Sequence, residues 1–189
     1  MKIDSLTKLL EEEIKDIYDF EKRLVRAIPK MAKAASSDEL RNALTEHMEV
    51  TKNQVGRIEQ VFEHLGVSPK AKPCAGMKGI LEEGEETIQT DAEDTLLDVA
   101  IIGAAQRMEH YEMAAYASVR MMAEQLGNQD IVDLLQETWD EEHEADERLS
   151  EICEQILSGM GGEEAEEMGE DEDEPAAKPA RRSGGGSTS

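Results

Sequence analysis

Apolar positions along the chain predict four long helices and one short one. From about Ser5 to Ala35, apolar side chains recur at steps of three and four, which is the spacing of one face of an α-helix. Three further segments repeat this spacing, and a shorter amphipathic stretch precedes the third long one. The long segments run over about 5–35, 36–65, 91–125 and 129–157, and the short one over about 77–89.

The residues between these segments predict how the helices are connected. Ser36–Glu39 has the Ser-x-x-Glu spacing of a capping box, so a second helix should start directly after the first. Thr90–Glu93 is a second such box, which predicts a helix start at about Asp91. The loop at 67–75 contains two prolines and is long enough, when extended, to cross the length of a bundle. We therefore expect an all-α four-helix bundle of two antiparallel hairpins, with the short helix in the crossover.

The C-terminal part of the chain has a different composition. Glu163–Glu174 is almost wholly acidic, and the chain ends in Gly184–Ser189, a run of glycine, serine and threonine. Such segments cannot bury enough apolar surface to fold alone. The expected division is a helical domain at 1–158 and a disordered tail at 159–189, which serves either to keep the protein in solution or as a docking peptide.

Charge and composition exclude several classes of partner. The chain has 44 acidic and 20 basic residues, a net charge of −24, which repels nucleic acids and anionic membranes. It has no apolar run of about 20 residues and no signal-peptide pattern. Two cysteines make neither a disulfide framework nor a zinc spacing. We expect a cytoplasmic protein, either in an ordinary cytoplasm or in a salt-rich one.

Acidic residues interrupt the apolar faces near the middle of the predicted helices. Glu109 and Glu112 lie one turn apart on the third long helix, among apolar neighbours. Burying a carboxylate costs several kcal/mol or more unless it is paired, protonated or bound to a metal. Counting from the predicted turns brings the helix midpoints to one level, where carboxylates and imidazoles suit iron or manganese. The candidate metal ligands are Glu21, Glu109, Glu112 and Glu142, followed by His47 and Asp146.

An alternative without metal is open for these residues. A glutamate such as Glu21 can turn to the edge of the bundle and pair with Lys52 or Arg107. A single core histidine such as His47 is more often hydrogen-bonded than a ligand. Residues off the predicted faces are expected to be solvated: Glu46, Glu49, Glu141 and Glu144. Beside the faces, His110 and His143 are weaker ligand candidates.

Several stretches resemble a known family. They are Tyr18–Leu24, Ile28–Ala35, His47–Thr51, Cys74–Gly79, Ala104–Tyr116 and Thr138–Asp146. Over about residues 4–157 the chain is similar to the YciE/YciF family of ferritin-like stress proteins, also known as DUF892. The resemblance implies a ferritin-like domain of five helices that forms a dimer and is linked to bacterial stress responses. It implies no established reaction.

The chain departs from the wider ferritin-like pattern, which has Glu-x-x-His on two helices. On the last long helix, Asp146 would have to replace the imidazole that should follow Glu142. The second long helix offers His47, but Val50 stands where the family has a second glutamate. The paired glutamates of the third long helix resemble those of rubrerythrin-type sites.

Two functions from different classes follow. The first is a dimetal-carboxylate protein that binds iron or manganese and consumes peroxide or oxygen, or oxidises Fe(II), during stress; Glu109 would bridge the ions. Tyr18, Tyr111 or Tyr116 could supply a proton or an electron, although packing is the more common role. The second is a non-catalytic interaction protein whose midpoint carboxylates pair with arginine, lysine and water. A homodimer is expected in both cases, and a storage cage is a third, weaker alternative.

Overall fold

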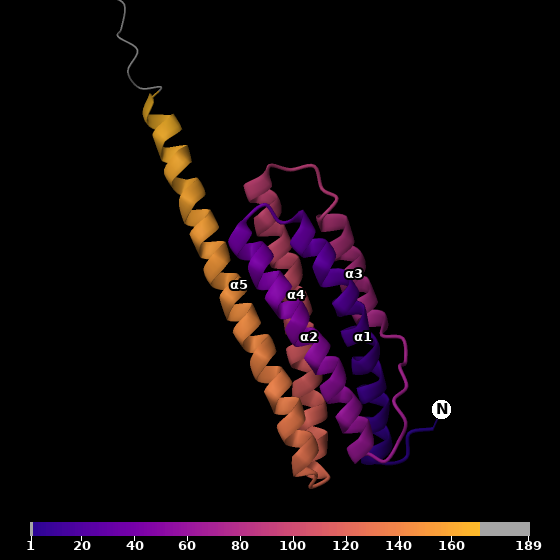
Figure 1. Cartoon of the computed structure of the whole chain (residues 1–189). Helices are drawn as coiled ribbons and strands as arrows, with labels where there is room; N and C mark the ends of the chain where they lie inside the picture. The colour runs from indigo at the N-terminus through magenta and orange to yellow at the C-terminus, as the bar shows by residue number, and fades with distance from the viewer. Residues whose placement is uncertain (1, 171–189) are drawn as a thin grey trace, which may run out of the picture.

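The computed structural model describes residues 2–170, with side chains up to residue 160, and this part of the chain forms five helices and no strand (Figure 1). The helices are α1 (Leu6–Ala34), α2 (Asp38–His64), α3 (Ala75–Thr87), α4 (Asp94–Gln125) and α5 (Gln129–Glu170). The predicted all-α class and helix order are confirmed. None of the described helices has the length and apolar character needed to cross a membrane.

Two antiparallel hairpins make the bundle. Figure 1 shows α1 beside α2 and α4 beside α5, each pair joined by a short turn. The hairpins pack together through α2 against α5 and α1 against α4, which closes a four-helix arrangement. The crossover carries α3, which lies on α4 and α1. The predicted topology is therefore the observed one.

The core is apolar at both ends of the bundle and polar in the middle. Residues of the four long helices that face inward at steps of three and four are almost fully buried, among them Leu10, Ile14, Leu40, Ile101 and Leu135. Near the midpoint Phe20 packs edge-on against Tyr111 and Tyr116, with ring centroids 5.8 and 6.3 Å apart. These aromatic rings lie between α1 and α4, beside the polar midpoint.

A buried aspartate of α4 binds the turn between α1 and α2 and so sets the position of α4 along the bundle axis. Asp98 is 3% exposed, and its two carboxylate oxygens accept hydrogen bonds from the backbone nitrogens of Ser36 and Ser37, both at 2.8 Å. These amides lie at the α1–α2 turn, where no helical carbonyl is available to them. Because charge-assisted bonds are the stronger ones, Asp98 holds the turn against α4 and helps to align the polar midpoints.

Two boundaries differ from the sequence prediction. The Thr90 hydroxyl donates to the backbone oxygen of Glu86 beyond the end of α3, at 3.2 Å, and does not cap the next helix, so α4 begins at Asp94 instead of Asp91. The last helix, predicted to end at about residue 157 and to be followed by a disordered tail, continues in α5 to Glu170. Glutamate, alanine and methionine are good helix formers and dominate this extension. The predicted disorder of 171–189 concerns residues outside the described part.

Candidate metal centre

Polar residues from all four long helices meet at the middle of the bundle. From α2 come His47, whose side chain is 11% exposed, and Gln54, which is fully buried. The other helices contribute glutamates that are at most 3% exposed: Glu21 from α1, Glu109 and Glu112 from α4, and Glu142 from α5. We call these six residues the midpoint cluster. Five of the six predicted ligands belong to it.

Three members of the cluster surround one point. The Nε2 atom of His47 lies 3.4 Å from Oε2 of Glu109 and 3.5 Å from Oε2 of Glu142. One ligand atom from each of the three residues lies within 4.8 Å of the others. Two carboxylates and one imidazole from three different helices are a donor set that suits iron or manganese. The remaining glutamates, Glu21 and Glu112, are the donors available for a second ion.

Unpaired oxygen atoms are concentrated in this cluster. Among the described residues, five buried side-chain oxygens lack a hydrogen-bond partner, and all five belong to it: Oε2 of Glu21, Oε1 of Gln54, Oε2 of Glu109, Oε1 of Glu112 and Oε2 of Glu142. A buried polar atom without a partner costs about 1–3 kcal/mol, and more when the group is charged. Four carboxylates, each with an unused oxygen, fit two divalent cations in charge and in ligand type.

Burial perturbs the acidity of all four glutamates. It raises the pKa of Glu109 to about 7. Burial and then repulsion from Glu142 raise the pKa of Glu21 to about 8, against the hydrogen bond from Tyr116, which lowers it. Burial, followed by repulsion from neighbouring carboxylates, puts the pKa values of Glu112 and Glu142 well above the usual range. Without a cation, the cluster therefore retains protons at neutral pH.

A buried arginine supports the cluster without neutralising it. Arg57 donates to both oxygens of Glu141, each at 2.9 Å, and to Oγ1 of Thr138 at 2.7 Å. Glu141 also accepts from Nε2 of Gln54 at 3.0 Å, and the same amide nitrogen donates to Glu142. Arg57 and Gln54 thus orient Glu142 through a chain of hydrogen bonds. The expectation that Glu141 is solvated was wrong, because α2 supplies it with a cationic partner.

Lysine and arginine do not pair with the core glutamates. Within the described residues, none lies within 4 Å of the carboxylates of Glu21, Glu109, Glu112 or Glu142; His47 is the only basic group at that distance. Lys52 pairs with Glu49 at 2.8 Å, and Arg107 is exposed. The two partners considered for Glu21 are therefore placed elsewhere.

Asp146 lies apart from the midpoint cluster, contrary to the expectation. Its carboxylate accepts from Nε2 of Gln106 at 3.0 Å and lies 3.3 Å from Nε2 of His110. Four residues at 100° each leave Asp146 rotated by about 40° from Glu142 around the helix. With its short side chain, it reaches the α4–α5 seam instead of the bundle centre.

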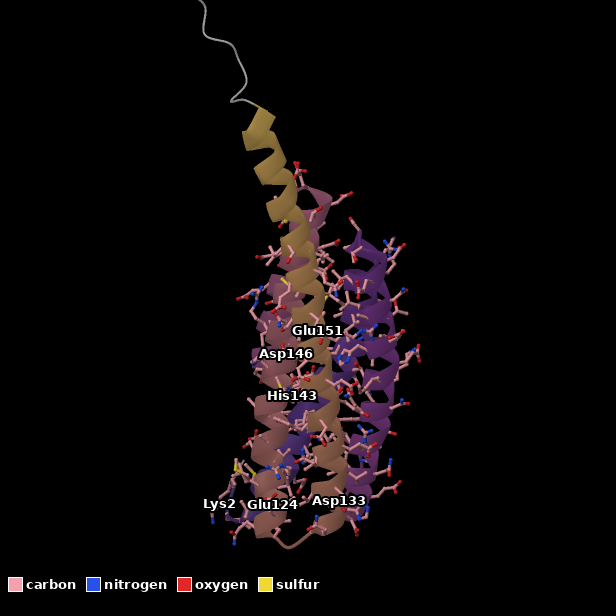
Figure 2. All side chains as sticks on the ribbon, turned by 90° about the vertical axis from the view of Figure 1, so that its left-hand side faces the viewer. Lys2, Glu124, Asp133, His143, Asp146 and Glu151 are labelled. Atoms are coloured by element: carbon pink, nitrogen blue, oxygen red, sulfur yellow. The ribbon has the colours of Figure 1, made fainter. Side chains whose placement is uncertain are left out.

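The histidines considered as weaker candidates lie on the outside of the bundle. Figure 2 looks onto α5 and shows His143 and Asp146 following one another along this helix. His143 is 49% exposed, and its ring lies 5.4 Å from that of Trp139. His110 is 65% exposed and contacts Asp146. Neither imidazole contacts the midpoint cluster.

One of the three tyrosines contacts the cluster. The hydroxyl of Tyr116 donates to Oε1 of Glu21, and burial followed by the charge of Glu21 raises the pKa of this phenol well above its usual value. Tyr18 instead donates to Glu59 at 2.6 Å, and the Tyr111 hydroxyl lies 3.2 Å from Sγ of Cys74. Tyr116 is therefore the tyrosine positioned to hold a proton beside the cluster.

Sequence reasoning did not identify Gln54 and Arg57 as parts of the site. Gln54 falls on the buried face of α2 in the same three-and-four spacing as the apolar residues, and this was the available signal. Arg57 follows one turn later and is 8% exposed. A glutamine or arginine in such a position needs a buried partner, which here is an acidic residue of α5.

Comparison with known proteins identifies the family. The DUF892 family, described as a domain of unknown function, matches residues 5–159. The chain belongs to the DUF892 family. This confirms the resemblance noted from the sequence. Protein YciF of Escherichia coli K12 is 39% identical over 141 residues, which are 74% of this chain and 85% of YciF.

Solved structures of similar proteins share the fold. The crystal structure of the E. coli stress protein YciF has a TM-score of 0.80 at 35% identity, and the match covers 82% of this chain and 99% of YciF. YcfI of Rhodopseudomonas palustris, for which a structural role has been suggested, has a TM-score of 0.77 at 38% identity, covering 79% and 95%. A protein from Xanthomonas campestris pv. campestris, with a TM-score of 0.67 at 23% identity over 85% and 99%, shows the fold alone.

Proposed function

We propose that this DUF892 protein is a ferritin-like dimetal-carboxylate protein of the stress response, which binds two iron or manganese ions in the midpoint cluster. The observation that carries the proposal is the set of four buried carboxylates, each with an unpaired oxygen and none with a lysine or arginine partner. Two divalent cations would neutralise four carboxylates and occupy their unused oxygens.

The residues of the cluster divide into two sets of ligands. His47, Glu109 and Glu142 would hold one ion, since their donor atoms already surround a common point. Glu21 and Glu112 would hold the other, next to Glu109 and Glu142. A bound pair of these ions would supply electron-transfer chemistry toward peroxide or oxygen, or would couple oxygen reduction to Fe(II) oxidation. Tyr116 would hold a proton at Glu21, and Gln54 would fix the orientation of Glu142.

Metal content tests this proposal. The purified full chain is loaded anaerobically with Fe(II) or Mn(II), desalted and measured by mass spectrometry. We expect about two ions per chain, and fewer than about a tenth of that in the double variant Glu109→Gln/Glu112→Gln, which preserves side-chain size and removes two ligand charges. Glu83→Gln/Glu86→Gln, at two exposed positions of α3, is the matched control and should load as the wild type does. A wild-type chain that stays metal-free after loading with either ion would refute the proposal.

A non-catalytic interaction role is the second candidate, because a structural role has been suggested for the relative YcfI. This role requires that the midpoint glutamates be stabilised without metal, and the described residues provide no lysine or arginine for them. The homodimer and the docking role of the tail stay predictions. A cytoplasmic location is part of the proposal, supported by the two cysteines, which are both free as in a reducing compartment.

A further inference from the structure

A cavity between α2 and α5 leads from the surface to the midpoint cluster. Its volume is about 220 Å³, and its inner wall includes His47 and Glu109. Liquid water occupies about 30 Å³ per molecule, so the cavity has room for a small cation with a shell of six waters. In Figure 2 the two helices that border it are seen with α5 in front and α2 at its side.

The ionisable groups along this cavity become more buried from its mouth inward. Glu46 and Glu144 line it at the surface, where both are exposed. Further in, the side chain of His47 is 11% exposed. Glu109 lines the inner end at 3% exposure, and its Oε2 atom has no hydrogen-bond partner. The cavity thus connects solvated carboxylates to an unpaired buried one.

One cationic side chain lines the cavity. Arg148 is 45% exposed, and its Nη1 atom lies 2.5 Å from Oε2 of Glu46, whose side chain is 65% exposed. An exposed ion pair of this kind contributes about 0–1 kcal/mol, so thermal motion opens it readily. Arg148 therefore makes the potential at the mouth of the cavity less negative, but it does not block access to the cavity.

We propose that this cavity is the route by which hydrated divalent cations reach the midpoint cluster, with Glu46 and Glu144 attracting them at the mouth and Arg148 opposing their entry. The inference rests on the proposed metal centre. Carboxylates at a cleft raise the local concentration of cations and their association rate, whereas an uncharged oxidant would gain nothing from them. At the inner end, the free oxygen of Glu109 and the imidazole of His47 are the first ligands that can replace water on the ion.

The rate of metal uptake tests the route separately from the metal centre. Full-length protein is mixed anaerobically with Fe(II) at low ionic strength, and at set times a coloured Fe(II) chelator reads the iron still free. We expect Glu46→Lys/Glu144→Lys to take up Fe(II) roughly tenfold more slowly than the wild type, and Arg148→Gln to take it up faster. The final iron content should be the same in all three proteins. Both effects should shrink as added salt screens the mouth.

Two control variants make the test specific. Glu83→Lys/Glu86→Lys changes the net charge by the same amount on exposed positions of α3 and should leave the rate near that of the wild type. Ala145→Leu adds bulk to the wall of the cavity and should slow uptake at every salt concentration. The proposed route is wrong if the wild type takes up iron and all the variants take it up at the wild-type rate: Glu46→Lys/Glu144→Lys, Ala145→Leu and the α3 control. In that case the metal centre still stands. If the wild type takes up no iron, the metal centre itself is refuted.

Discussion

Metal-free protein is expected to lose stability as the pH rises from about 5 to 8. Burial raises the pKa of Glu109 to about 7 and that of Glu21 to about 8, from 4.5 in the unfolded chain. Between pH 4.5 and 7 the native state thus holds at least these two protons, which the unfolded state has released; Glu112 and Glu142, whose pKa values also lie well above the usual range, add to the effect. For each such proton, the free energy of unfolding falls by about 1.4 kcal/mol for every unit by which the pH rises. The protons on Glu109 and Glu21 together give a fall of roughly 3 kcal/mol per pH unit.

Bound metal should remove this dependence, because cations would replace the retained protons. Urea unfolding at pH 5, 6, 7 and 8, with chelator or with excess Mn(II), measures the effect. We expect the two curves to lie close together at pH 5 and to separate by several kcal/mol at pH 8, where the loaded form is the more stable. Metal-free protein that instead becomes more stable over this range would show that the glutamates are ionised and paired in the native state.

Replacing Glu142 by glutamine should stabilise the metal-free protein and prevent metal loading. Glu142 is fully buried, and its charge contributes to the raised pKa values of Glu21 and Glu112. Glutamine keeps the oxygen that accepts from Gln54 and removes the charge. We expect a gain of about 1–3 kcal/mol in metal-free stability at pH 8, measured by urea unfolding, and at least about a 100-fold loss of affinity for Mn(II), measured by calorimetry.

The control for this variant is Glu151→Gln, nine residues along the same helix and exposed, which should change neither quantity by much. The sign of the stability change separates the two proposed functions. Removing one member of a buried ion pair costs about 3–5 kcal/mol, so a large loss of metal-free stability in Glu142→Gln would favour the interaction protein with paired carboxylates.

Local sequence signals were sufficient to predict the helices and their order. Apolar spacing identifies each long helix, and glycine marks two of the helix ends: Gly66 and Gly127 have φ values of 68° and 71°, which glycine adopts without strain. Local signals were less reliable at the start of α4. The Thr90–Glu93 pattern is that of a capping box, but the Thr90 hydroxyl bonds backward to Glu86, and this choice depends on where α3 ends.

The sequence predicted the height of the candidate site along the bundle, but not which side chains point into it. Counting from the turns places Glu112 level with Glu142, and Glu21 one turn from His47, because antiparallel helices of a hairpin keep their register. The rotation of each helix about its axis decides which side chain points inward, and packing against neighbours sets that rotation. Asp146, rotated by about 40° around α5 from Glu142, therefore faces the α4–α5 seam, where it contacts Gln106 and His110. The Arg57–Glu141 pair, which links two helices distant in sequence, had no local signal.

Anomalous diffraction from crystals loaded anaerobically with Mn(II) or Fe(II) at pH 7–8 tests the central claim most directly, because it locates the ions. Data collected on both sides of the metal absorption edge distinguish the loaded ion from other scatterers. The proposal predicts two peaks inside the bundle, one at bonding distance from His47, Glu109 and Glu142 and one beside Glu21 and Glu112. A loaded crystal with peaks only among surface carboxylates, and none at the midpoint cluster, would contradict it.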